Sequence, residues 1–425
     1  MSEFSRFELA SGVNLHVWHE PKFKTISTRL LSSQRLRPVS VSYNALLPRV
    51  LRRGTQSYPS MRRISAELEQ LYGSRLVTDV AKIGGMQVMV FGLDCVSGSF
   101  VGEAASLYPR ALGLLDEVVH RPCISGGAFR SEFVEQEKDA LSKQIRAMVN
   151  DKTQYSLLRC IEEMYSGEPY GLHQLGSLDE VRDISADTLF AHYEHVRMAP
   201  VDVLVAGNIH EEHAISSIQE AFELPERTVP ADDDASPRPE PREVRQISEH
   251  QPVAQAKLSM GFRTFAAYPN DSVYPTMLFE GILGGFPHSK LFINVREKHS
   301  LAYYAQSILD PSQGAMFVIA GIEPTQYQRA SEIILQQVEL IRQGEFTQFE
   351  MEATRSALVN RLKSSLDSCS AVMGAYYEQM LSGEPKSVQD RLERLNAVTR
   401  QQIVEAAQRT VLDTVHLLSP AGGVN

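Results

Sequence analysis

A proline-rich, acidic segment near the middle of the chain most constrains how this protein can fold. Residues 225–245, PERTVPADDDASPRPEPREVR, contain five prolines and an Asp triplet but almost nothing apolar. Proline fixes φ and removes a backbone donor, and the segment has no apolar face to bury. It therefore predicts an extended linker between an N-terminal domain, residues 1–224, and a C-terminal domain, residues 246–425.

Length and charge narrow the class of protein. At 425 residues the chain exceeds what one hydrophobic core usually serves, which agrees with two domains. Its formal net charge of −10 disfavours a nucleic-acid or polybasic membrane-surface protein, since both need a basic surface. No apolar run approaches the ~18 residues of a membrane span, and the start lacks a signal-peptide pattern. The four cysteines form no CxxC pair. We expect a soluble, cytoplasmic protein.

Both halves mix strands with helices in a similar order. Apolar or alternating runs predict strands at residues 15–18, 87–91, 202–207, 256–261 and 315–322. Helical spacing of apolar residues predicts helices at 60–71, 105–119, 129–149, 274–283, 286–297, 326–342, 346–366 and 371–381, the first of them capped by Ser60. The predicted fold class is α+β, with two α/β domains whose like order suggests an internal duplication.

The common catalytic and phosphate-binding motifs are absent from the sequence. It contains no GxxxxGK[ST], GxGxxG, GxSxG or HExxH pattern. Three pairs of histidines are close in sequence: His16 with His19, His192 with His195, and His210 with His213. The first pair falls on opposite faces of a strand and cannot share a metal. The second could share a helix face, but Tyr193, Glu194 and Arg197 beside it are typical of a solvated surface. The third is typical of a helix's N-terminal turn.

Two other segments carry a more specific pattern. Residues 284–305, GGFPHSKLFINVREKHSLAYYA, resemble the C-terminal signature of the pitrilysin (insulinase) metallopeptidase family, "LF…VREK…LAY". Residues 44–55, NALLPRVLRRGT, are similar to that family's catalytic helix, where HxxEH precedes a short apolar stretch and Lys/Arg-Gly-Thr. The resemblance implies two homologous domains, each an antiparallel-rich sheet with packed helices, which form half of a clamshell.

The chain departs from this family where zinc would bind. Anchored on Arg-Gly-Thr, the resemblance places the first zinc-binding His at Ala45, the catalytic Glu at Pro48 and the second His at Arg49. The third ligand, a Glu on a later helix, falls on Gln144. Two imidazoles and a carboxylate hold zinc in such enzymes while the Glu accepts a proton from bound water. Ala45, Pro48 and Arg49 can do neither, and Pro48 should distort the helix. We therefore expect an inactive member that binds no zinc.

Basic residues gather over the same part of the chain. Residues 45–75 hold six arginines and two glutamates, a local charge of +4 in an acidic protein. One interpretation is that Arg49 supplies positive charge in place of the metal and pairs with Glu137 or a neighbouring carboxylate. The alternative is a solvated basic helix face.

The signature of the second half keeps its functional residues. In the family an Arg and a Tyr seven residues later orient the substrate near zinc, and the resemblance places them at Arg296 and Tyr303. A guanidinium and a phenol can donate hydrogen bonds to a peptide carbonyl and its developing oxyanion. Alternatively, Arg296 lies at an exposed charged corner and the Tyr303–Tyr304 pair packs within a strand.

These observations leave three hypotheses open. The preferred one is a zinc-free, non-catalytic subunit that pairs with a catalytic homologue and supplies Arg296 and Tyr303 to a peptide substrate in the shared chamber. The second is a homodimeric scaffold that captures extended peptides at a sheet edge and has no peptidase role. The third, an enzyme with a non-standard metal site or nucleophile, has only the histidine pairs in its favour.

Overall fold

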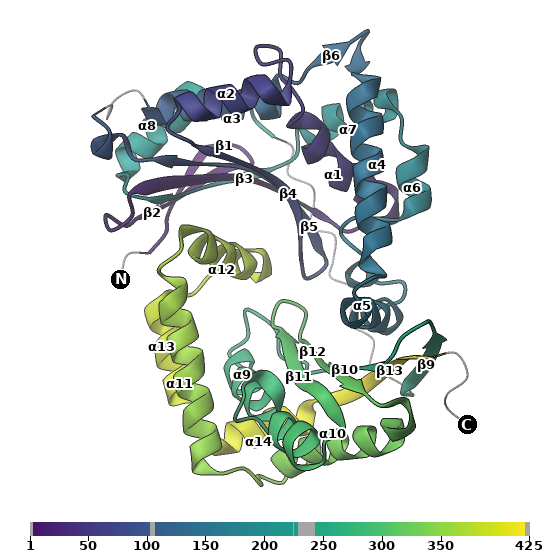
Figure 1. The fold of residues 1–425 in the computed structure, drawn as a ribbon. Helices are drawn as coiled ribbons and strands as arrows, with labels where there is room; N and C mark the ends of the chain where they lie inside the picture. The colour runs from purple at the N-terminus through teal and green to yellow at the C-terminus, as the bar shows by residue number, and fades with distance from the viewer. Residues whose placement is uncertain (1–2, 103–106, 224, 228–242, 421–425) are drawn as a thin grey trace. The chain divides into compact units, whose positions relative to one another are not determined.

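The computed structural model describes residues 3–102, 107–223, 225–227 and 243–420, and the chain divides into two compact units (Figure 1). The first unit takes the described residues of 1–146 and 172–236, and the second takes those of 147–171 and 237–425. Most of the predicted linker lies outside the described residues. The boundaries drawn around it stay a prediction, and the second unit also includes residues 147–171, which precede that linker.

The first unit is built on a six-stranded sheet with the order β1-β2-β8-β3-β5-β4. Its strands are β1 (Ser5–Ala10), β2 (Val13–His19), β3 (Thr25–Arg35), β4 (Arg75–Ile83), β5 (Met86–Val96) and β8 (Val201–Gly207), and a short hairpin adds β6 (Ile124–Ser125) and β7 (Ala128–Phe129). Neighbouring strands of the sheet pair antiparallel, except that β2 and β8 run parallel. Strand β4 forms one edge of this sheet.

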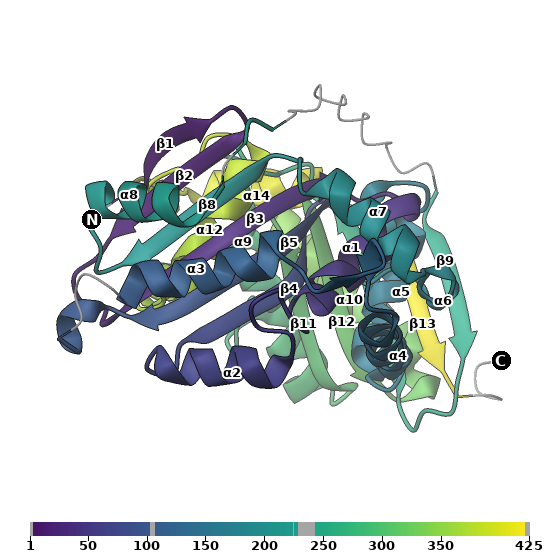
Figure 2. The same cartoon turned by 90° about the horizontal axis from the view of Figure 1, so that it is seen from above.

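The first unit has seven α-helices within its described residues, of which α1, α3 and α8 contact the strands of the sheet (Figure 2). The seven are α1 (Pro38–Leu51), α2 (Met61–Gln70), α3 (Leu107–His120), α4 (Ser131–Met148), α6 (Leu178–Asp183), α7 (Ala186–Val196) and α8 (Glu211–Ala221). Leu47 of α1 lines a small apolar cavity with Leu30 of β3 and Phe91 of β5, which places α1 against this sheet. Ser60 caps α2 as predicted, because its hydroxyl accepts a hydrogen bond from the Arg63 amide.

The second unit repeats the strand order of the first. Its sheet runs β11-β12-β10-β13-β9, with β9 (Arg245–His250), β10 (Ala256–Arg263), β11 (Ala302–Asp310), β12 (Ala315–Ile322) and β13 (Val411–Ser419). Taken in chain order, these strands occupy the places of β2, β3, β4, β5 and β8. Strands β9 and β13 are parallel, as β2 and β8 are, and the other pairs are antiparallel. The fold is thus mixed α/β with mostly antiparallel sheets, which confirms the predicted class.

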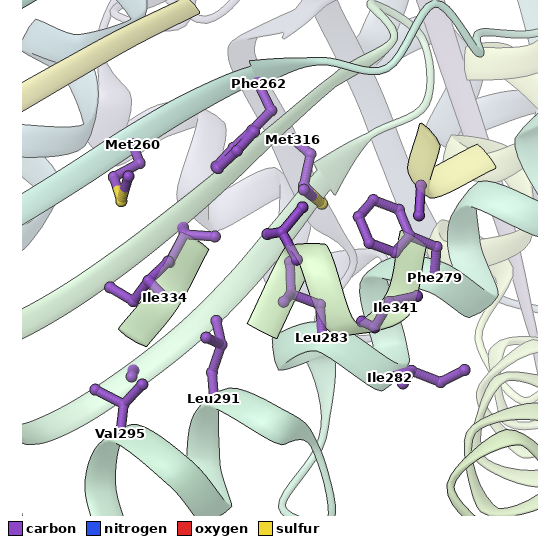
Figure 3. Close-up of a cluster of buried hydrophobic side chains, with 14 of the residues drawn as sticks. Met260, Phe262, Phe279, Ile282, Leu283, Leu291, Val295, Met316, Ile334 and Ile341 are labelled. Carbon is purple, nitrogen blue, oxygen red and sulfur yellow. The ribbon is translucent and has the colours of Figure 1, made fainter. Parts of the chain in front are cut away.

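The main core of the second unit lies between one sheet face and a layer of helices. These helices are α9 (Val273–Glu280), α10 (Tyr327–Arg342), α11 (Gln348–Ser365), α13 (Val388–Ala397) and α14 (Arg400–Arg409), whereas α12 (Cys369–Ser382) contributes no described residue to this core cluster. Figure 3 shows Met260, Phe262 and Met316 of the strands beside helical residues such as Phe279 and Ile334. Full burial of such side chains contributes about 1.5–3 kcal/mol each.

The opposite face of this sheet is covered by α5 (Lys152–Met164). Cys160 and Met164 pack against Phe317 and Ile319 of β12. With helices on both faces, every residue of β12 is buried, which explains its continuous apolar run. Gly261 of β10 allows the close approach, since a Cβ there would lie 2.6 Å from the Met164 sulfur.

The helices around residue 286 differ from the sequence-based expectation. The helix predicted at 274–283 is α-helical only to Glu280 and continues as a π-helical segment, Gly281–Gly285. The helix predicted at 286–297 does not begin at Phe286, whose backbone is extended because Pro287 follows. The second half of that stretch belongs to another π-helical segment, Phe292–Lys298. No helix within the described residues is both long and apolar enough to cross a membrane.

Candidate functional site

Helix α1 carries the three substituted positions of the first unit. The helix begins with Pro38, whose fixed φ suits a first turn, and nine of its 14 residues are buried. The expected distortion at Pro48 does not end the helix, which runs through Pro48 to Leu51. Pro48 lies in the last turn, so its missing amide costs only one hydrogen bond, and packing holds the rest of the helix in place.

The four predicted positions meet in one place. Ala45, Pro48 and Arg49 line a cavity of about 220 Å³ together with Arg52 and residues 78–80 of β4. Gln144 of α4 joins them, because the Arg49 guanidinium donates a hydrogen bond to its side-chain oxygen. The cavity therefore lies between the last turn of α1 and the edge strand β4. The side chain of Arg49 connects it to Gln144 of α4.

The charges at this site pair differently from the expectation. The direct Arg49–Glu137 ion pair is not formed; instead, Arg53 Nη1 lies 3.3 Å from Glu137 Oε1. Glu137 is buried, and Arg53 follows the end of α1, where its side chain can reach α4. Burial lowers the pKa of Arg49, and the charge of Glu137 opposes this shift from a distance.

The residues present do not fit a zinc ion. A methyl group, a proline ring and a guanidinium offer no lone pair to a metal, and the amide of Gln144 is already hydrogen-bonded to Arg49. Within the part of the chain that the structure describes, no three His, Cys, Asp or Glu side chains are grouped as metal ligands. These side chains therefore cannot hold the metal that metal-assisted hydrolysis requires.

A buried polar network behind α1 was missed by the sequence reasoning. The Asn44 side chain donates to Gln87 Oε1 (3.0 Å) and to Gln34 Oε1 (3.3 Å), and its oxygen lies 2.7 Å from His192 Nε2. Burial, together with the nearby His195, lowers the pKa of His192 to about 4, so a neutral His192 donates this bond at pH 7. The network fixes α1 against β3, β5 and α7.

The histidine pairs serve structural roles. The expectation of a solvated surface beside His192 is wrong for Tyr193, which is buried and donates a hydrogen bond to the Val119 carbonyl. His16 is buried 3.3 Å from Asp202, and the rings of His19 and His210 stack with centroids 4.3 Å apart. These contacts account for the rings of His16, His19 and His210 without a metal, whereas His195 is exposed.

The second unit contains a serine, a histidine and a carboxylate in consecutive contact, a line that resembles a catalytic triad. Ser156 Oγ lies 3.0 Å from His416 Nδ1, and His416 Nε2 lies 3.4 Å from Glu249 Oε1. Such a line can activate a serine for nucleophilic attack. Here Ser156 and His416 are both 0% exposed, and Ser156 also meets the Ser259 hydroxyl at 2.9 Å. Because no substrate can reach the hydroxyl, the line attaches α5 to the sheet.

Arg296 and Tyr303 both lie on the surface of the second unit. The Arg296 guanidinium sits over the Phe292 ring, 4.6 Å from its centroid, on the π-helical segment Phe292–Lys298. Tyr303 lies at a bulge in the edge strand β11, is 61% exposed, and its hydroxyl is 3.5 Å from Glu323 Oε1. Among the described residues, no hydrogen bond or ring contact joins the two side chains. The neighbouring Tyr304 is the one that packs, with its hydroxyl 2.8 Å from Thr153 Oγ1.

Comparisons with known proteins agree with these features. A family model described as the peptidase M16 inactive domain matches residues 183–358. The "Probable inactive metalloprotease YmfF" of Bacillus subtilis is 34% identical over 418 residues, which cover 97% of each chain. The chain belongs to the M16 peptidase family.

Other M16 relatives extend the likeness. The "Uncharacterized zinc protease YmxG" of Bacillus subtilis is 25% identical over 276 residues, 62% of this chain and 66% of its own. Among solved structures, a conserved protein from Enterococcus faecalis V583 superposes with a TM-score of 0.91 at 27% identity, with both chains covered in full. The peptidase M16 inactive domain from Pseudomonas fluorescens matches over 100% of both chains, with a TM-score of 0.81 at 16% identity. The M16 fold therefore extends over the whole chain.

Proposed function

We propose that this M16 chain is a zinc-free, non-catalytic subunit that pairs with a catalytic M16 homologue and supplies Arg296 and Tyr303 to the partner's peptide substrate. The observation that carries the proposal is the substitution of the metal site. Arg49 hydrogen-bonds Gln144 where the family's zinc ligands would meet. A site that cannot hold zinc leaves binding and positioning as the tasks of this chain.

The second unit supports the positioning role. Arg296 has a side-chain exposure of 43% and Tyr303 projects from an edge strand, so both can reach a bound ligand. Each can donate hydrogen bonds to a peptide carbonyl. The cytoplasm is the proposed compartment, because the four cysteines are buried thiols rather than disulfides.

Reconstitution with the catalytic homologue tests the proposal. We expect Arg296→Ala and Tyr303→Phe each to lower peptidase turnover by about 100-fold or more, the loss that removal of a transition-state hydrogen-bond donor produces. Complex formation, measured by size-exclusion chromatography, should be unchanged. Arg329→Ala is the matched control, since Arg329 is an exposed arginine of the same unit whose partner is Glu332. Full turnover in both variants would contradict the proposal.

A peptide-binding homodimer is the second candidate. Strands β4 and β11 each form an edge of their sheet, and an edge strand offers unpaired backbone groups to an extended peptide. Size-exclusion chromatography and co-purification from the native cell separate the two candidates. A homodimer that retains no M16 homologue would favour this second function over the first.

A further inference from the structure

The cavity beside Arg49 carries two guanidinium groups from one helix. Arg49 and Arg52 are three residues apart on α1 and its C-terminal cap, and both line the cavity of about 220 Å³. Residues three apart in a helix lie on the same side, so the two guanidinium groups reach the same space. The opposite wall is formed by Thr78, Asp79 and Val80 of β4.

The positive charge of this cavity is only partly neutralised. Arg49 hydrogen-bonds the neutral amide of Gln144, while Glu137 is paired with Arg53. No described residue forms an ion pair or hydrogen bond with the side chain of Arg52. Asp79 is the only carboxylate in the lining, and it accepts a hydrogen bond from the Val80 amide at 2.8 Å. Two arginines and one carboxylate leave the lining with a net charge of +1.

A polar group in the wall lacks a partner as well. The Thr78 hydroxyl is buried and forms no hydrogen bond within the described part of the chain. This hydroxyl oxygen is closed to solvent, so a ligand could reach it only after the side chain rotates. Like-charge repulsion between Arg49 and Arg52, added to the burial of Arg49, is unfavourable. A bound anion would relieve this repulsion and pair with the partly buried guanidinium group.

We infer that this cavity binds a carboxylate group of an extended peptide, either the C-terminal carboxylate or an Asp or Glu side chain. A guanidinium presents two parallel N–H groups to a carboxylate. A peptide is favoured as the source because β4 is an edge strand, so a chain that pairs with it passes the rim of the cavity. A monoanion is favoured over a phosphate dianion because Asp79 lies in the wall. The inference rests on the proposed role of this chain in binding peptides.

Three labelled peptides test the inference on the full-length chain. All carry the same N-terminal dye and the same alternating Val and Thr sequence, except that one residue of the third peptide is replaced. The first ends in a free carboxylate, the second in an amide, and the third is an amide with one internal Glu. Dissociation constants are measured by fluorescence anisotropy at pH 7 and low ionic strength, where carboxylates are ionised and screening is weak.

We expect at least one of the two carboxylate peptides to bind about 10-fold more tightly than the neutral amide. The one that does so identifies the source of the carboxylate. Arg52→Gln and Arg49→Gln should each reduce this ratio toward one. Arg62→Gln should keep it, because Arg62 is an exposed arginine of α2 that does not line the cavity. Arg52 is exposed as well, so its replacement leaves the fold intact, which thermal unfolding verifies.

Three results would overturn the inference. Equal affinity of all three peptides for the native chain would do so while leaving the proposed function intact. So would a carboxylate preference that survives both Arg52→Gln and Arg49→Gln. Absence of binding by every peptide would overturn the inference together with the proposed peptide-binding role.

Discussion

Arg49 shows how one residue changes the chemistry of a site. The resemblance to the family aligns it with a zinc-binding His, and its guanidinium satisfies part of its hydrogen-bonding capacity through Gln144. Burial lowers its pKa, but an arginine remains charged far above neutral pH. The Arg49 guanidinium therefore stays positively charged and has no free lone pair. It can neither ligate a metal nor act as a base.

A second residue, Glu280, gives the molecule a pH dependence. Burial raises its pKa to about 7, against hydrogen bonding from Ser307 and the charge of Arg361, which both act to lower it. The folded chain therefore binds more protons than the unfolded chain between pH 4.5 and 7. The stabilising contribution is complete below about pH 4.5 and is lost as the pH rises to about 7.

We predict that Glu280→Gln flattens the pH dependence of unfolding. The Gln side chain keeps an oxygen that can accept the Ser307 hydrogen bond, 2.7 Å long in the native chain, and does not ionise. The free energy of unfolding of the native chain should fall with pH by up to about 3 kcal/mol through this group between pH 4.5 and 7. Urea unfolding at several pH values measures the slope. Glu332→Gln, an exposed carboxylate of α10, is the control, and an identical slope in native chain and Glu280→Gln would refute the prediction.

At the scale of elements, local signals predicted well and distant contacts did not. The Ser60 cap and the apolar spacing located α2 within one residue at each end. Helix α5 was missed, although Asp151 caps it and its apolar residues recur at helical spacing. The packing of α5 against the sheet of the second unit could not be predicted from local sequence, because the Ser156–His416 contact joins residues 260 apart.

In the candidate site, too, positions close in sequence could be predicted, whereas contacts between distant residues could not be predicted from spacing. The resemblance to the family placed Ala45, Pro48 and Arg49 in one segment, and on the helix that forms there residues three and four apart share a face. The contact between Arg49 and Gln144 spans 95 residues, and here the family pattern supplied what spacing could not. The choice of Arg53 rather than Arg49 as the partner of Glu137 depends on where α1 ends relative to α4, which no sequence pattern specifies.

The docking of α5 gives a prediction at this scale. Met164 is 2% exposed and packs against β10 and β12, so Met164→Ala should lower the free energy of unfolding by roughly 2–5 kcal/mol. Gln154→Ala, an exposed change on the same helix, should shift it by less than about 0.5 kcal/mol. Urea unfolding measures both. Amide exchange in α5 should accelerate in Met164→Ala only, and equal stability of the two variants would show that α5 is not part of this core.

For the whole molecule, the two units share one strand order, including the parallel pairs β2–β8 and β9–β13. A shared order with a parallel pair at the same place supports duplication of an ancestral unit. The two units differ in their chemistry. By resemblance to the family, the first carries Arg49 at a zinc-ligand position, and the second carries Arg296 and Tyr303 at positions of the C-terminal signature.

Zinc stoichiometry tests the central claim most directly. The purified full-length chain is equilibrated with zinc, dialysed and analysed by mass spectrometry for metal content, beside an M16 homologue that has an intact HxxEH motif. We predict a zinc content close to zero for this chain and close to one equivalent for the homologue. One equivalent of zinc bound to this chain, together with peptidase activity that a chelator abolishes, would contradict the account.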